Sequence, residues 1–282
     1  MKMILLAGIG LLAIATAAAP ATAADLPIKA PVYKAAPIDP WNWSGFYIGG
    51  NVGYSWGNSD TDAVFSNATS GAFLFAQSNS FDMNGVIGGG QIGYNWQFAP
   101  TWVLGIEADI QASGQDGSTS FLCPGTICSA GLTAIPAVSA PSTATLNQSL
   151  DWFGTVRGRV GYTFTPTILA YFTGGLAYGK IATDGTLSGF NANGLPTTVS
   201  FSGDTTKAGW TIGGGIEGRI AGNWTAKIEY LYMDFGTVST TAVSPLIFVP
   251  APGTGLRADF SSRVTDNVVR VGINYKFGYA HF

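Results

Sequence analysis

A repeated alternation of side chains constrains this chain more than any other feature. Residues 43–56 alternate between large apolar side chains and small or polar ones, so that one face carries Phe46, Ile48, Val52, Tyr54 and Trp56. A period of two indicates a β-strand with one apolar face. An ordinary strand has about 5–6 residues. This longer stretch suits a strand that crosses a bilayer, which needs ~9–11 residues with lipid outside and a polar lumen inside.

The pattern recurs seven more times, in 85–98, 102–111, 152–164, 168–178, 210–220, 224–232 and 269–277. Short turns alternate with long polar segments, which are 58–82, 114–149, 182–206 and 237–265. This alternation is typical of outer-membrane barrels. The sequence therefore predicts an all-β fold, an eight-stranded antiparallel up-and-down transmembrane β-barrel with short periplasmic turns and four long extracellular loops. Both ends of the barrel then lie on the periplasmic side.

Composition and aromatic placement favour this barrel over a soluble β-sandwich. Charged residues make up only 10% of the chain, against ~25% in a typical soluble domain. None of the 14 prolines falls within the eight segments, as expected where every ladder bond must form in lipid. Tryptophans cluster at segment ends, as in the two aromatic girdles of a membrane barrel: Trp56, Trp152 and Trp210 on the extracellular side, and Trp96, Trp102 and Trp224 on the periplasmic side, with Trp43 close by.

Three regions divide the chain. Residues 1–23 combine an early Lys2, a long apolar run and a small-x-small ending, which is the pattern of a secretory signal peptide. Residues 24–42 are rich in proline and predict an extended periplasmic tether. Residues 43–282 form the predicted barrel domain, which places the protein in the outer membrane of a Gram-negative cell.

Charged residues of the eight segments fall on the inward face. Because an Arg or Lys facing lipid at mid-bilayer costs about 2–4 kcal/mol, we expect them inside the lumen. An eight-stranded barrel is only wide enough for side chains, so an ion network that fills the lumen is a better interpretation than catalysis. The predicted network consists of Glu107, Asp109, Arg157, Arg159, Glu217, Arg219, Lys227, Glu229, Arg270 and Lys276. Inward glycines such as Gly49, Gly53, Gly213 and Gly215 would leave room for the arginines.

Few other residues suggest chemistry. Cys123 and Cys128 lie close together in an exported chain, so we expect a small loop disulfide, with two free thiols as the alternative. The only histidine, His281, lies beyond the last strand. We therefore predict no catalytic site, metal site or cofactor. The net charge of −3 is too small to indicate nucleic acid as a partner.

Two stretches resemble a known family. These are the opening strand with its Ala24-Asp25-Leu26-Pro27 tether start, and the closing strand Val269-Arg270-Val271-Gly272-Ile273-Asn274-Tyr275-Lys276-Phe277. They are similar to the small immunogenic outer-membrane proteins of alphaproteobacteria. The resemblance implies that the barrel assembly machinery recognises the closing strand by its terminal aromatic residue. We predict that this residue is Phe277 rather than Phe282.

The resemblance implies a structural and surface-antigen role in envelope integrity and surface interaction. The alternatives are a small porin-like channel for ions or small solutes, and a surface protein that binds heme or another ligand. Partners expected for such a barrel are outer-membrane lipid, lipopolysaccharide and the assembly machinery, together with peptidoglycan or host ligands as further candidates. Fold similarity by itself does not choose among these roles.

Overall fold

The computed structural model describes residues 41–128, 141–191, 194–244, 247 and 255–277. The predicted signal peptide, most of the predicted tether, Phe282 and His281 lie outside these ranges. Among the described residues, no helix is long and apolar enough to cross a membrane. The elements are β1 (Gly45–Asn67), β2 (Phe73–Gln97), β3 (Trp102–Cys123), α1 (Gly125–Cys128), β4 (Ser142–Thr165), β5 (Ile168–Phe190), β6 (Pro196–Ala221), β7 (Trp224–Ser244) and β8 (Leu256–Lys276).

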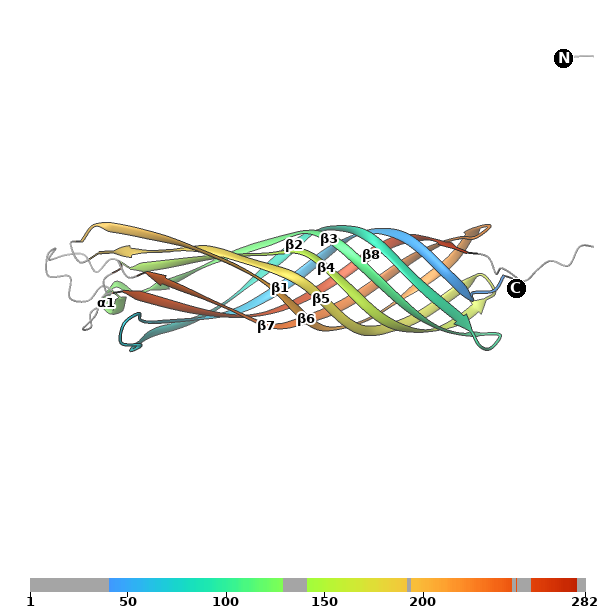
Figure 1. The fold of residues 1–282 in the computed structure, drawn as a ribbon, viewed down its shortest axis with the longest axis horizontal. Coiled ribbons are helices and arrows are strands. Elements are labelled where there is room, and N and C mark those ends of the chain that lie inside the picture. The colour runs from blue at the N-terminus through green and yellow to red at the C-terminus, as the bar shows by residue number, and fades with distance from the viewer. Residues whose placement is uncertain (1–40, 129–140, 192–193, 245–246, 248–254, 278–282) are drawn as a thin grey trace, which may run out of the picture. The chain divides into compact units, whose positions relative to one another are not determined.

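The eight strands form one closed antiparallel barrel in sequence order (Figure 1). Closure is made by β1 and β8, which pair from Tyr47↔Lys276 to Asn67↔Leu256. In the part of the barrel that holds the short turns, closure leaves no unpaired edge, so backbone polar groups can be satisfied within a bilayer. The predicted eight-stranded transmembrane barrel is confirmed.

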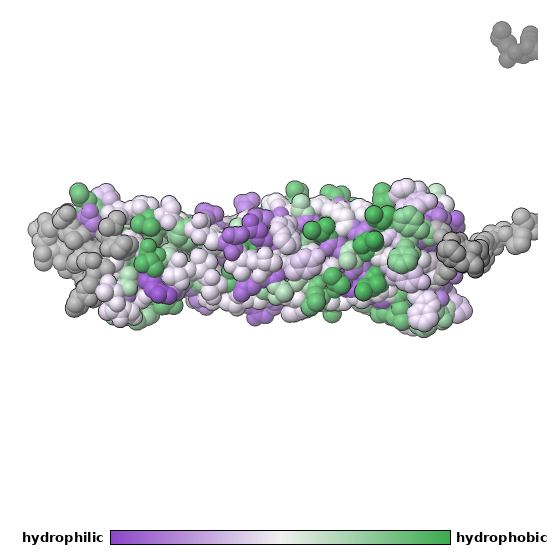
Figure 2. Space-filling model, viewed as in Figure 1, coloured by the Kyte–Doolittle hydropathy of each residue, from purple (hydrophilic) through white to green (hydrophobic). Residues whose placement is uncertain are grey.

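Side chains alternate around the end of the barrel that holds the short turns. On β8, Val271 and Ile273 are half exposed on the outside, whereas Arg270 and Asn274 are buried inside. Figure 2 shows apolar side chains gathered over this part of the surface. Exposed tryptophans border this apolar band, with Trp56 and Trp210 at one limit and Trp96, Trp102 and Trp224 at the other. The arrangement matches a membrane band between two aromatic girdles.

The four long connections are mainly strands rather than loops. β1 continues to Asn67 and β2 begins at Phe73, so only five residues of the predicted loop 58–82 lie outside strands. Strands likewise occupy much of the other three predicted loops, 114–149, 182–206 and 237–265. The barrel therefore extends well beyond the membrane band. We call this part the extension; its members are the strand residues beyond the level of Trp56, Trp210 and Asn267.

Along β8, polarity reverses between the membrane band and the extension while the strand keeps its register with β1. On β8, the inward positions nearest the tip are Leu256, Ala258 and Phe260, all buried, and the outward ones include Arg257 and Ser261, both exposed. In the membrane band the same strand is apolar outside and polar inside. The reversal follows the surroundings, since lipid covers the band whereas water surrounds the extension.

Within the extension the barrel divides into two sheets. The β2–β3 ladder stops at Asn84↔Asp116 and the β6–β7 ladder stops at Trp210↔Asp234. Beyond these pairs, β7, β8, β1 and β2 form one sheet, and β3, β4, β5 and β6 form the other. Phe260 joins them, because its ring lies 5.6 Å from those of Phe121 and Phe201 in the opposite sheet.

The orientation of the barrel gives a first prediction. Cysteines introduced at Ser70, at the tip between β1 and β2, and at the exposed Ser261 should react with an impermeant thiol reagent on intact cells. Cysteines at Thr101, Thr167 and Asn223, in the three short turns, should not react, because those turns face the periplasm. Surface labelling at the short turns would overturn this orientation.

Candidate functional site: the filled lumen

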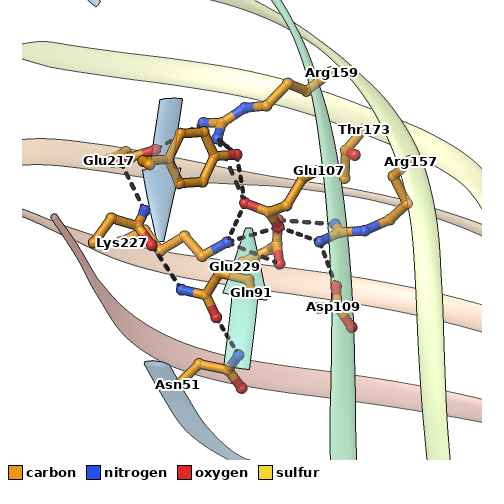
Figure 3. Close-up of polar contacts among 12 residues, drawn as sticks. Asn51, Gln91, Glu107, Asp109, Arg157, Arg159, Thr173, Glu217, Lys227 and Glu229 are labelled. Atoms are coloured by element: carbon orange, nitrogen blue, oxygen red, sulfur yellow. Dashed lines mark hydrogen bonds and ion pairs between the residues drawn. The ribbon is translucent and has the colours of Figure 1, made fainter. Parts of the chain in front are cut away.

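Arg157 belongs to a buried ion network inside the membrane band, where its guanidinium points toward Glu107 and Asp109 (Figure 3). It faces Glu107 across the β3–β4 ladder, and its guanidinium lies 2.5 Å from Glu107, 3.0 Å from Asp109 and 3.0 Å from Glu229. All four side chains are at most 2% exposed. These side chains occupy inward positions on β3, β4 and β7. They lie close together because the lumen of an eight-stranded barrel is narrow.

Three further bases complete the network. Arg270 lies 2.6 Å from Glu229 and 2.9 Å from Asp109, and the Lys227 ammonium lies 2.8 Å from Glu107. Arg159 pairs with Glu217 at 2.8 Å. The network thus contains four acids and four bases, namely Glu107, Asp109, Glu217 and Glu229 with Arg157, Arg159, Lys227 and Arg270. Its formal charges cancel, which offsets part of the cost of burying them.

Tyrosines and amides surround the ions, and the sequence patterns did not single them out as network members. The Tyr47 hydroxyl donates to Glu107 at 2.8 Å, and the Tyr171 hydroxyl donates to Glu229 at 2.9 Å. The Arg159 guanidinium also lies 3.9 Å from the Tyr171 ring centroid, a cation–π distance. Both tyrosines occupy inward positions of the period-two pattern. That pattern was the sequence signal that could have identified them as lining the lumen.

An amide chain continues the network toward β1. Asn51 donates to Gln91, Gln91 donates to Asn274 at 2.7 Å, and Asn274 donates to Glu217 at 2.9 Å. Gly49 makes room for this chain, because a Cβ at that position would lie 2.1 Å from the Asn274 amide oxygen. A Cβ at Gly53 would lie 2.7 Å from the Arg270 Cβ. The inward glycines therefore accommodate amides as well as arginines.

Two predicted members lie outside the network. Arg219 and Lys276 are inward by alternation, but they sit at the periplasmic mouth, where both contact Trp41, at 4.6 Å and 4.3 Å from its ring centroid. Arg219 donates to the Gly222 carbonyl, and Lys276 donates to the Asn42 carbonyl. Their assignment to the ion network was wrong, because alternation fixes the face of a residue and not its depth along the lumen.

Trp43 closes the periplasmic mouth. It is 1% exposed and packs in one buried cluster with Val103, Leu169 and Tyr171. Its indole nitrogen donates to the Pro166 carbonyl at 3.1 Å. The expectation that Trp43 belongs to the periplasmic girdle is therefore corrected. Trp43 precedes β1, so it is free of the strand alternation and turns into the lumen.

Two clusters of apolar side chains occupy the lumen beyond the network, together with buried polar side chains such as Gln148 and Asp266. The first cluster includes Met83, Phe153, Met233 and Val268. A second cluster, nearer the tip, includes Phe65, Phe121, Phe260 and Cys123. Cys123 is disulfide-bonded; Cys128, at the end of α1, is the only other cysteine in the sequence. Within the described part of the lumen, buried side chains thus extend from Trp43 through the ion network to Phe260.

Comparison with known proteins identifies the family. A family model described as "Outer membrane protein beta-barrel domain" matches residues 9–277. The chain belongs to this outer-membrane β-barrel family. It is 37% identical to a 31 kDa outer-membrane immunogenic protein of Brucella melitensis, over 98% of this chain and 100% of that protein. It is 29% identical to a 22 kDa outer membrane protein of Rhizobium leguminosarum, over 86% of this chain and 82% of that protein.

Solved structures resemble this outer-membrane barrel only weakly. The outer membrane protease OmpT of Escherichia coli gives a TM-score of 0.39 at 8% identity, covering 82% of this chain and 97% of that one. A likeness at this level says nothing of activity. The Brucella relatives support the predicted resemblance to the immunogenic proteins of alphaproteobacteria, and they place this chain in the outer membrane.

Phe277 is the last described residue of this outer-membrane barrel. Its ring is half exposed on the outside next to Tyr275, and its N–H donates to the Phe46 carbonyl at 2.9 Å. Val269, Val271 and Ile273 share that outer face, and Lys276 points inward. This register fits an aromatic that ends the lipid-facing alternation, as proposed for the assembly signal.

Assembly should therefore depend on Phe277 more than on Phe282. We expect Phe277→Ala to reduce the amount of heat-modifiable barrel in the outer membrane, because it removes the terminal lipid-facing aromatic of β8. Phe282→Ala serves as the matched control, and a chain ending at Phe277 should still insert. The opposite order of effects would show that the signal lies in the last five residues.

Proposed function

We propose that this outer-membrane barrel is a structural and surface-interaction protein whose lumen does not conduct and which has no enzymatic activity. The relatives are named as immunogenic outer-membrane proteins, which supports exposure at the cell surface. The extension supports the same role, because it carries a rigid, polar-faced structure above the membrane. Binding residues on such a scaffold are expected at its outer surface and tip.

The filled lumen is the observation that carries this proposal. A solute entering from the periplasm meets Trp43, then the ion network, and then two apolar clusters. Interiors packed in this way leave few voids larger than a water molecule. A porin-like function would require all of these layers to move aside. Their ion pairs and packing contacts oppose such a movement.

The same packing argues against enzymatic chemistry inside the barrel. A general acid or base must reach the proton that it transfers. Glu107, Glu217 and Glu229 are each 2% exposed and ion-paired, so no substrate can approach them. Within the described ranges, no group of three histidine, cysteine or acidic side chains could hold a metal ion.

Three kinds of partner fit this role. Outer-membrane lipid, including lipopolysaccharide, would contact the apolar band, and the assembly machinery would read β8. Host or surface ligands would bind the extension. Planar-bilayer recording of the refolded protein tests the central part of the proposal, and we expect no steady channel events.

A further inference from the structure

One seam of the extension leaves two strand edges unpaired. Above Trp210↔Asp234, residues 196–209 of β6 pair only with β5, and residues 236–244 of β7 pair only with β8. Among the described residues, no hydrogen bond joins residues 196–208 to β7. Unpaired edges present backbone donors and acceptors that can pair with another chain.

The opposite seam, between β2 and β3, is bridged by side chains. Asn79 donates to the Ser120 carbonyl at 2.8 Å, and the Leu122 N–H donates to the Gln77 side-chain oxygen at 3.1 Å. Gln115 donates to the Met83 carbonyl at 3.3 Å. Both seams lie at corresponding places between the two sheets. The β2–β3 seam is bridged by these amide side chains, and the described part of the β6–β7 seam has no such bridge.

The exposure of β6 residues shows that another chain could contact β6 at this seam. Residues 202–206 are all exposed, which interrupts the alternation seen along the rest of the strand. A Cβ added at Gly203 would meet no atom within 4 Å. By contrast, a Cβ at Gly117, in the bridged seam, would lie 2.3 Å from the Asp82 carbonyl oxygen. Open space therefore lies beside the β6 edge and not beside the β3 edge.

The chemistry of the open seam suits an uncharged strand. Residues 235–244 of β7 contain no charged residue. On β6, Asp204 lies 3.4 Å from Lys180 of β5 and is thereby paired, so Lys207 is the only other charge in 196–209. Phe201 packs against the inner core, and Val238 is buried on the other side of the seam. Natural edges are often protected by charged residues or bulges, and this edge has few.

We propose that the β6–β7 seam is a docking site for an extended segment of another protein, which adds to the β6 edge as a strand. Backbone hydrogen bonds would supply affinity, and alternate side chains would supply selectivity. The segment would place apolar side chains toward Phe201 and uncharged polar ones toward water. This inference rests on the proposed function in one respect: both require the extension to lie outside the membrane.

A second copy fits the seam less well than a single segment. The two edges share a paired base at Trp210 and Asp234 and are not paired with each other beyond it, so the hydrogen-bonding groups of the β6 edge can take one added strand. A second barrel, upright in the same membrane, would bring a whole sheet against this opening. The proposed occupant of the seam is therefore an extended segment of another protein.

The test uses a fluorescent peptide that copies residues 235–244, because β7 already pairs with β6 in the antiparallel register below. Anisotropy of this peptide is measured against the full chain refolded in detergent micelles. We expect saturable binding, and binding at least about tenfold weaker for the same peptide N-methylated at alternate residues, a change of 1.4 kcal/mol. No saturable binding, or equal binding of the N-methylated peptide, would overturn the proposal.

Thr205→Pro and Thr206→Pro then locate the site. Neighbouring N–H groups of a strand point to opposite sides, so one of these variants removes a donor from the open edge and the other removes a donor from the β5 ladder. The variant that keeps a heat-modifiable barrel should lose peptide binding. Undiminished binding by a folded variant contradicts the site, and a stable dimer that the peptide dissociates would assign the seam to a second copy. Conductance is measured separately, so failed binding leaves the proposed closed lumen intact.

Discussion

Replacing Arg157 with alanine should lower the free energy of unfolding of the barrel by about 3–5 kcal/mol, because it leaves buried carboxylates without their partner. Arg157 contacts Glu107, Asp109 and Glu229 at once, and it is 1% exposed. The remaining bases cannot replace it without giving up acids that they already pair with. Urea titration of the refolded protein, followed by the heat-modifiable gel shift, measures the change.

Arg219→Ala is the matched control for this prediction. It removes the same charge from an exposed position, where the main contact is with the Trp41 ring. An exposed cation–π contact contributes about 0.5–1 kcal/mol. If both variants unfold at the same urea concentration as the wild type, the ion network does not stabilise the barrel as we argue.

Removing Phe260 should destabilise the extension while the membrane band stays folded. Phe260 joins the two sheets through Phe121 and Phe201 and is 2% exposed. A buried Phe→Ala substitution costs about 3–5 kcal/mol. We expect Phe260→Ala to make the extension sensitive to limited proteolysis while a protected, heat-modifiable fragment persists.

Phe73→Ala provides the comparison, because Phe73 also lies in the extension but is 67% exposed. Its proteolysis pattern should match that of the wild type. If Phe260→Ala abolishes insertion altogether, or leaves the extension fully resistant, the extension does not depend on the core that Phe260 joins.

The membrane band could be predicted because its pattern has one solution. Charged residues such as Arg157 and Arg270 cannot face lipid, so their alternation with apolar residues fixes both strand and face. The extension was missed although it carries an alternation too. Residues 256–264 place Leu256, Ala258 and Phe260 opposite Arg257 and Ser261. Because the polar residues of this segment lie on the outer face, it does not match the apolar outer face of a membrane strand and resembles a loop.

Depth and closure could not be predicted from alternation. Arg219 and Lys276 have the correct face but lie at the mouth beside Trp41. Trp43 lies outside any strand, so no period applies to it, and its burial depends on space between Val103 and Leu169 that only the closed barrel defines. The open β6–β7 seam likewise depends on how far each ladder continues, which no local pattern encodes.

Planar-bilayer recording tests the closed lumen most directly. The protein without the predicted signal peptide, shown by heat modifiability to be folded, is inserted into a bilayer in concentrated KCl, with a known open porin as positive control. We predict no steady conductance steps, because Trp43, the ion network and two apolar clusters block the path in series. Reproducible steps of uniform size from folded barrels would contradict the account.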